Sequence, residues 1–171
     1  AAMAYVMKQD FLSYMVTMFY LINCQRIMLK DFHLTVIKKL QGLVDGTNEK
    51  RNLALCLPVG SGKSLLTEYF ISWCFARSRD NAFVYTSHSE DLITKMSAEI
   101  RSICTFPMWQ RLFGWVLKKD DRQKTNFSFE GAKNRTGLRA KAINSAITGL
   151  DAGNPAVDGF SGALIIDDPM D

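Results

Sequence analysis

The segment Leu57-Pro58-Val59-Gly60-Ser61-Gly62-Lys63-Ser64 determines which fold is expected for this chain. It follows a short apolar run, Leu53 to Leu57, and precedes a segment whose apolar residues recur at helical spacing. A glycine-rich turn between a strand and a helix is the setting in which backbone N–H groups can converge on phosphate oxygens. The sequence therefore predicts a strand at 53–57, a phosphate-binding loop, and a helix that begins near Lys63.

Each residue type in this loop has a chemical reason for its position. Gly60 and Gly62 can adopt backbone conformations closed to other residues, which lets successive N–H groups point inward. Lys63 would reach the β- and γ-phosphates of ATP as a catalytic cation, and the Ser64 hydroxyl would bind Mg²⁺. The expected nucleotide-binding set also includes Pro58, Val59 and Ser61. The full pattern has a glycine where Leu57 stands, so an ordinary glycine-rich turn with a solvated lysine remains the alternative.

A second motif follows about 100 residues later, where the apolar run from Ala163 to Ile166 ends in Asp167 and Asp168. A buried strand that delivers carboxylates at its carboxyl end is the Walker B arrangement. Asp167 would hold Mg²⁺, and Asp168 would orient and deprotonate the attacking water. The alternative is a strand that ends in a solvated acidic turn.

The remaining pattern alternates helices with strands. We expect a buried helix over Phe11 to Ile22, a helix over about 32–45 with Asp31 as its N-cap, and a strand over Ala82 to Tyr85. Ser87 and Glu90 form a possible capping box for the next helix. The segments around Phe127 to Phe129 and Leu138 to Ile143 alternate apolar and polar residues, which favours antiparallel or edge strands.

Parallel strands joined by helices predict an α/β domain, and the phosphate loop makes it a P-loop NTPase. We expect the RecA-like (ASCE) form, a layered α/β/α structure with a mainly parallel central sheet, incomplete at its C-terminus. Residues 1–50 would be a helical lead-in packed on an ATPase core at 51–171.

Composition limits the class of protein only loosely. A chain of 171 residues suits one domain, and 21 Lys plus Arg against 17 Asp plus Glu is too small a surplus to indicate a nucleic-acid partner. Basic residues gather only between Lys118 and Lys141, where a solvated face and contact with a DNA backbone are both open. Four separated cysteines in apolar surroundings indicate reduced thiols, a cytoplasmic location and no cysteine-bound metal. The apolar run at Phe11 to Ile22 is too short to cross a bilayer.

Taken together, several segments resemble the large subunit of the terminases of tailed bacteriophages and prophages. The resemblance covers most of the chain, and its closest part is Ile147 to Gly153 followed by Gly159 to Pro169. The other segments that carry it are Asp31 to Leu40, Leu57 to Ser64, Phe83 to Ser89 and Met108 to Gly114. Relatives often have an adenine-reading glutamine in the first of these segments, where this chain has His33.

The resemblance implies an ATPase that uses ATP and Mg²⁺ to move double-stranded DNA into a procapsid. It implies a homo-oligomeric ring, a small terminase subunit and a portal protein as partners, the host cytoplasm as location, and no membrane. A nuclease domain follows the ATPase domain in such proteins, whereas this sequence stops at Asp171. We therefore expect a fragment that binds nucleotide more readily than it turns ATP over.

Two other functions remain open. A superfamily-2 helicase or translocase shares the phosphate loop and an acidic Walker B strand, and Asp167-Asp168-Pro169-Met170 can be misread as a helicase box. A nucleotide-binding module of a packaging complex that does not hydrolyse ATP would keep the fold without the chemistry. ATP hydrolysis with and without linear DNA separates these functions.

Overall fold

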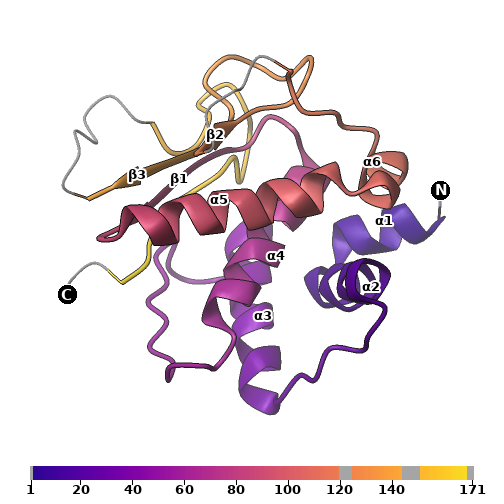
Figure 1. Cartoon of the computed structure of the whole chain (residues 1–171), viewed down its shortest axis with the longest axis vertical. Coiled ribbons are helices and arrows are strands. Elements are labelled where there is room, and N and C mark those ends of the chain that lie inside the picture. The colour runs from indigo at the N-terminus through magenta and orange to yellow at the C-terminus, as the bar shows by residue number, and fades with distance from the viewer. Residues whose placement is uncertain (1, 120–124, 144–150, 169–171) are drawn as a thin grey trace.

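A computed structural model describes residues 2–119, 125–143 and 151–168 of the chain (Figure 1). The helices are α1 (Ala2–Gln9), α2 (Phe11–Asn23), α3 (Asp31–Asp45), α4 (Lys63–Arg77), α5 (Glu90–Thr105) and α6 (Pro107–Phe113). The strands are β1 (Ala82–Ser87), β2 (Asn126–Phe127), β3 (Gly137–Ala142) and β4 (Leu164–Ile166). These elements make the chain an α/β protein, as the sequence predicts.

The described strands form one open sheet in the order β2-β3-β1-β4. β1 pairs in parallel with both β3 and β4, and the short edge strand β2 is antiparallel to β3. The expected antiparallel or edge character is therefore right for β2, whereas β3 lies inside the sheet, antiparallel to β2 and parallel to β1. Gly137 opens β3 with a φ of +99°, and a side chain there would collide with the backbone carbonyl of Phe127. The missing Cβ lets the two strands meet.

Helices α4 and α5 pack side by side on one face of this sheet (Figure 1). Phe83, Leu138 and Phe127 stand in register across three strands. The ring of Phe75 in α4 lies 5.5 Å from that of Phe83 and 5.8 Å from that of Phe127. The Arg101 guanidinium of α5 lies 5.3 Å from the Phe127 ring. A shared contact on Phe127 places both helices on the same side of the sheet.

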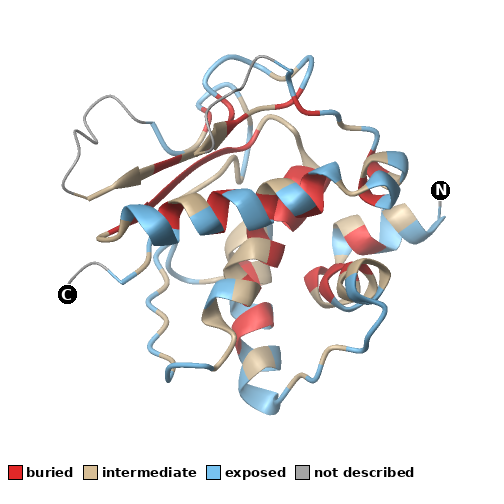
Figure 2. Ribbon diagram, viewed as in Figure 1, coloured by how far each residue is buried: buried red, intermediate tan, exposed pale blue. Residues whose placement is uncertain are grey.

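Helix α4 is the centre of the core (Figure 2). Apolar residues surround almost its whole circumference from Leu66 to Ala76, which is typical of a helix buried on all sides. Helices α1, α2 and α3 pack against α4 away from the sheet, and Phe11 stacks on Trp73 with ring centroids 5.0 Å apart. The core thereby fixes the helix that begins at Lys63.

The structure corrects the expected strand at 53–57. Leu53, Leu55 and Leu57 are half-buried against the core while Ala54 and Cys56 are exposed, but the segment pairs with no described strand. Alternating burial is what a strand produces, yet a strand needs a hydrogen-bonded neighbour to exist.

The predicted buried strand before Asp167 also differs from expectation. β4 lies at the edge of the sheet, and Leu164 and Ile166 are 51% and 56% exposed because they point away from the face that α4 and α5 cover. An α/β/α sandwich has helices on both faces of its sheet. At β4 no described helix covers the second face, so the three-layer form stays a prediction.

Helix boundaries follow their local signals with two exceptions. Asp10 caps α2 by accepting a 2.7 Å hydrogen bond from the Ser13 amide, and Gly46 ends α3 with a φ of +71°. The N-cap of α3 is Lys30 rather than Asp31, and that of α5 is Ser89 rather than Ser87.

The cysteines divide into two pairs of different burial. Cys74 and Cys104 are buried thiols, and burial raises the pKa of each. Cys24 and Cys56 are exposed, contrary to the apolar packing that their sequence surroundings suggested. Among the described helices, none combines the length and apolar character that a membrane span needs.

Candidate functional site

The glycine loop leads into α4 with the backbone conformation that its glycines were expected to supply. Gly60 and Gly62 have φ values of +77° and +79°, in the left-handed region that other residues seldom adopt. The Ser61 amide closes a turn onto the Pro58 carbonyl at 3.2 Å, and a Cβ at Gly60 would meet nothing within 4 Å. Val59 is fully exposed at the tip. The loop therefore presents an open side at the positive end of a helix.

The structure brings Lys63 together with the two acidic residues that follow β4. Its ammonium nitrogen lies 3.1 Å from Asp168 Oδ1 and 3.6 Å from Asp167 Oδ1. These partners are about 105 residues away along the chain. The first motif and the second motif of the sequence thus form one cluster at the carboxyl end of β4.

The two carboxylates favour the charged form of Lys63. The hydrogen bond to Asp168 raises the pKa of Lys63, and the carboxylate of Asp167 acts in the same direction. Asp167 is the more enclosed of the two acids, with 17% of its side chain exposed against 54% for Asp168. In this arrangement the single positive charge of Lys63 offsets only part of the negative charge of the two carboxylates.

Tyr85 of β1 holds the second oxygen of Asp167. Its hydroxyl donates a 2.8 Å hydrogen bond to Asp167 Oδ2, leaving Oδ1 turned toward Lys63. Burial and this hydrogen bond raise the pKa of Tyr85. The sequence alone does not single out Tyr85. The parallel pairing of β1 with β4 places Tyr85 near the acids, but that pairing is visible only in the structure.

His88 anchors the backbone of the other acid. The Asp168 carbonyl accepts a hydrogen bond of 2.6 Å from His88 Nδ1 and a longer one of 3.4 Å from the His88 amide. Because a carbonyl can only accept, Nδ1 carries the hydrogen. Asp168 has a φ of +41°, which a non-glycine residue adopts only when its surroundings hold it there.

The oxygen atoms at this site suit Mg²⁺, which prefers carboxylates, hydroxyls and phosphate oxygens. Asp167 and Asp168 converge on the same lysine, and the Ser64 hydroxyl is exposed on the first turn of α4. No described contact joins Ser64 to either acid. In residues 2–119, 125–143 and 151–168, no group of three or more His, Cys, Asp or Glu residues could hold a metal ion. Mg²⁺ is ordinarily bound by one or two carboxylates together with the phosphate oxygens of a substrate, and this site could offer the two carboxylates.

His33, which stands where the resembling family often has an adenine-reading glutamine, lies next to the glycine loop. Its Nδ1 accepts a 2.8 Å hydrogen bond from the Lys30 amide, and its Nε2 is 2.8 Å from the Ser61 carbonyl. The ring also lies against that of Phe32, with centroids 3.9 Å apart and the two planes tilted by 36°. These contacts occupy both ring nitrogens.

Glu68 is an ionisable residue of α4 that sequence reasoning did not single out. Burial and the nearby charge of Glu99 raise its pKa to about 7, while Lys95 opposes the shift. Glu68 also adds to the negative charge around Tyr85. A glutamate that titrates near neutral pH thus lies on the same helix as Lys63.

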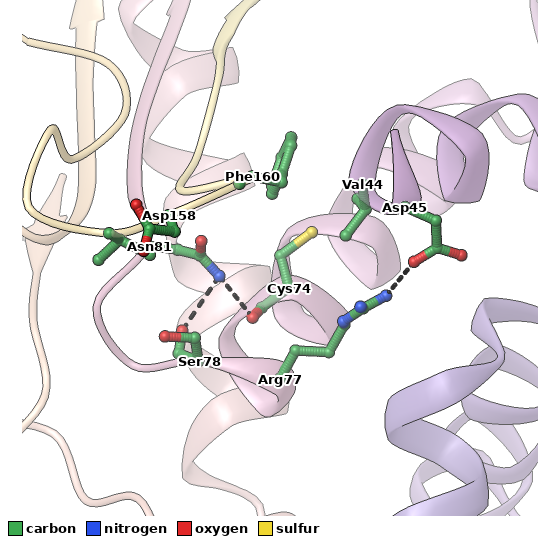
Figure 3. A pocket seen from close by; sticks show the side chains of 10 residues that line it. Val44, Asp45, Cys74, Arg77, Ser78, Asn81, Asp158 and Phe160 are labelled. Carbon is green, nitrogen blue, oxygen red and sulfur yellow. Dashed lines mark hydrogen bonds and ion pairs between the residues drawn. The ribbon is translucent and has the colours of Figure 1, made fainter. Parts of the chain in front are cut away.

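A different cavity, of about 430 Å³, lies at the opposite end of α4 (Figure 3). Arg77 pairs there with Asp45 at 2.7 Å, and the Asn81 side chain donates to the carbonyls of Cys74 and Ser78. Arg77 is 14 residues from Lys63, which is about 21 Å along a helix. None of the residues expected to bind nucleotide lines this cavity.

The sequence offers one more candidate, Thr148-Gly149, which could sense the γ-phosphate, contact DNA or form an ordinary turn; these two residues lie outside the described residues. No family model, no curated protein and no solved structure matches this chain.

Proposed function

We propose that this chain binds ATP with Mg²⁺ at the glycine loop and is the RecA-like ATPase part of a terminase large subunit that packages double-stranded DNA. The observation that carries the nucleotide site is the meeting of Lys63 with Asp167 and Asp168, at 3.6 and 3.1 Å, beside an open glycine loop. A solvated lysine after an ordinary turn would have no reason to meet the acids that end a distant strand. The terminase assignment rests on the sequence resemblance.

In this proposal, Lys63 exchanges partners when nucleotide binds. Triphosphate oxygens compete with the two carboxylates for its ammonium group, and the N-terminus of α4 adds its positive end to the same anion. Mg²⁺ bound with the phosphates would neutralise part of their charge. Tyr85 keeps the Asp167 carboxylate oriented, and Asp168 is left to position the water and accept its proton.

A non-hydrolysing nucleotide-binding module is a second candidate, and one specific observation favours it. The segment 53–57 that leads into the loop has no strand partner among the described strands, and the side chains of β4 are half-exposed on one face. Hydrolysis requires the catalytic groups to be held closely in their reactive positions, whereas nucleotide binding tolerates less accurate positioning. We therefore expect this chain to bind ATP with slow turnover.

Titration calorimetry with ATP and Mg²⁺ tests the nucleotide site. The Lys63→Ala variant should lose at least about tenfold in affinity, since a charge-assisted contact contributes about 1.5–3 kcal/mol. The matched control is Lys38→Ala, which removes an exposed lysine of α3 and should leave affinity unchanged. Equal affinity in the Lys63 and Lys38 variants would contradict the site.

Turnover measured with and without linear double-stranded DNA tests the motor assignment. Stimulation by duplex DNA without strand separation supports a packaging ATPase, and unwinding of a tailed duplex supports a helicase. Binding with no turnover under either condition supports the non-hydrolysing module.

A further inference from the structure

A cavity of about 280 Å³ lies beside the glycine loop. One wall is the connection from Ile27 to Lys30, between α2 and α3, and the opposite wall is the loop from Gly60 to Gly62 together with Leu65 of α4. Most of the side chains around it are apolar, and Met28 is 90% exposed at its edge. A ligand whose phosphates bind the glycine loop would place its next groups here.

His33 connects the two walls of this cavity. The Lys30 amide donates to Nδ1, so the hydrogen of the neutral ring is on Nε2, which donates to the Ser61 carbonyl. Each hydrogen bond measures 2.8 Å. A neutral imidazole has one donor and one acceptor, and both are in use.

We propose that His33 is a positioning residue that ties the Ile27–Lys30 connection to the glycine loop and does not read the base. This inference rests on the proposed nucleotide site. To read a nucleobase, a side chain needs a donor or acceptor that is free to meet the base edge, and His33 has none left. Its ring instead holds the carbonyl of Ser61, which fixes the orientation of the peptide between Ser61 and Gly62 in the phosphate loop.

The proposal separates affinity for the triphosphate from selection of the base. A loop that is held in its phosphate-binding conformation before the ligand arrives loses less entropy on binding. Loss of the two hydrogen bonds of His33 should lower the affinity for every triphosphate by a similar factor, including a triphosphate without a base. A residue that reads adenine would affect ATP alone.

The experiment compares ATP, GTP and inorganic tripolyphosphate, each with Mg²⁺, by titration calorimetry. The informative variant is His33→Asn, because the asparagine oxygen replaces Nδ1 as acceptor for the Lys30 amide, while nothing replaces Nε2. Retention of this helix-capping contact should keep the thermal unfolding temperature near that of the wild-type chain. His33→Ala, which removes both contacts, is the comparison for loss of the cap.

We expect His33→Asn to bind all three ligands about threefold to tenfold more weakly than wild type, the range of one hydrogen bond. The ratio of ATP to GTP affinity should not change. Unchanged tripolyphosphate affinity together with weaker ATP binding would overturn the proposal and make His33 a base reader. Unchanged affinity for all three ligands would also overturn the proposal, and His33 would then serve only to cap α3. Failure of the proposed function looks different, because wild type itself would then bind none of the three ligands.

Discussion

The hydroxyl of Tyr85 lies 2.8 Å from Oδ2 of Asp167, across the parallel pair of β1 and β4. Tyr85 stands opposite Ile165, so its side chain reaches past the end of β4 to the acid two residues on. One carboxylate oxygen is thereby occupied by a neutral donor, and the other faces Lys63. A fixed carboxylate offers a metal ion a prepared ligand instead of a freely rotating one.

Tyr85→Phe should weaken the dependence of nucleotide binding on Mg²⁺. Without the hydroxyl, Asp167 can rotate, and we expect the gain in ATP affinity on adding Mg²⁺ to fall about threefold to tenfold, the range of one hydrogen bond. Affinity measured in EDTA should stay the same. Tyr20→Phe is the control because Tyr20 is exposed on α2. An equal loss with and without Mg²⁺ would show that Tyr85 supports the fold instead of the acid.

Glu68 should make stability fall as pH rises. Its pKa of about 7 in the folded chain exceeds the ordinary value of 4.5, so between these pH values the folded state holds a proton that the unfolded chain has released. The stabilisation from that proton is complete below pH 4.5 and is lost as pH rises through 7. Because Glu68 is only partly enclosed, we take the effect as about 1–2 kcal/mol.

Urea unfolding at about pH 5 and about pH 8, on either side of the folded-state pKa, measures this effect. Glu68→Gln should have a higher free energy of unfolding than wild type at the higher pH, and the difference should shrink at the lower pH. Glu130→Gln, at an exposed position, is the control and should change neither value. A difference that is the same at both pH values would exclude titration of Glu68 as the cause.

Tyr14→Phe should destabilise the packing of α2 on the rest of the core. The buried Tyr14 hydroxyl donates to Ser72 Oγ and accepts from Trp109 Nε1, each at 2.9 Å. Phenylalanine would leave the buried indole N–H without an acceptor, which costs about 1–3 kcal/mol. Chemical denaturation gives this difference directly. Tyr5→Phe, where the ring is exposed, should cost less than about 0.5 kcal/mol, and equal costs at the two positions would contradict the network.

The sequence predicts those parts of the site whose conformation depends only on residues nearby in the chain. Gly60 and Gly62 have the positive φ values that the loop motif requires, and Lys63 begins α4 as expected. Asp167 and Asp168 directly follow β4, as the short apolar run before them predicts. Tyr85 and His88 could not be found in this way, since their roles depend on which strand lies beside β4. That neighbour is set by tertiary packing.

The wrong expectations have the same physical origin. Leu53 to Leu57 has the composition of a strand, but pairing depends on a partner strand elsewhere in the molecule. The apolar run at β4 has the composition of a central strand, yet Leu164 and Ile166 are half-exposed because they point away from the face that α4 and α5 cover. Local composition fixes the tendency to be extended, whereas burial depends on what packs against each face.

Gly162 allows β4 to approach β1, and its replacement tests whether that approach builds the site. It has a φ of +129°, and a Cβ there would collide with the backbone of Ala82. Ala82 is held on both sides at this point, donating to the Ser161 carbonyl at 2.8 Å and accepting from the Gly153 amide at 2.9 Å. Gly162→Ala should therefore displace β4 and cost more than about 2 kcal/mol of stability.

Gly159→Ala separates this collision from backbone strain alone. Gly159 also has a positive φ, +79°, but a Cβ there would meet nothing within 4 Å, so the expected cost is about 1 kcal/mol. If β4 positions the acids, Gly162→Ala should also lose nucleotide affinity at temperatures where it remains folded, because Asp167 moves away from Tyr85 and Lys63. Gly159→Ala should keep that affinity. Equal stability and equal binding in the two variants would mean that Asp167 and Asp168 reach Lys63 without the close contact between β4 and β1.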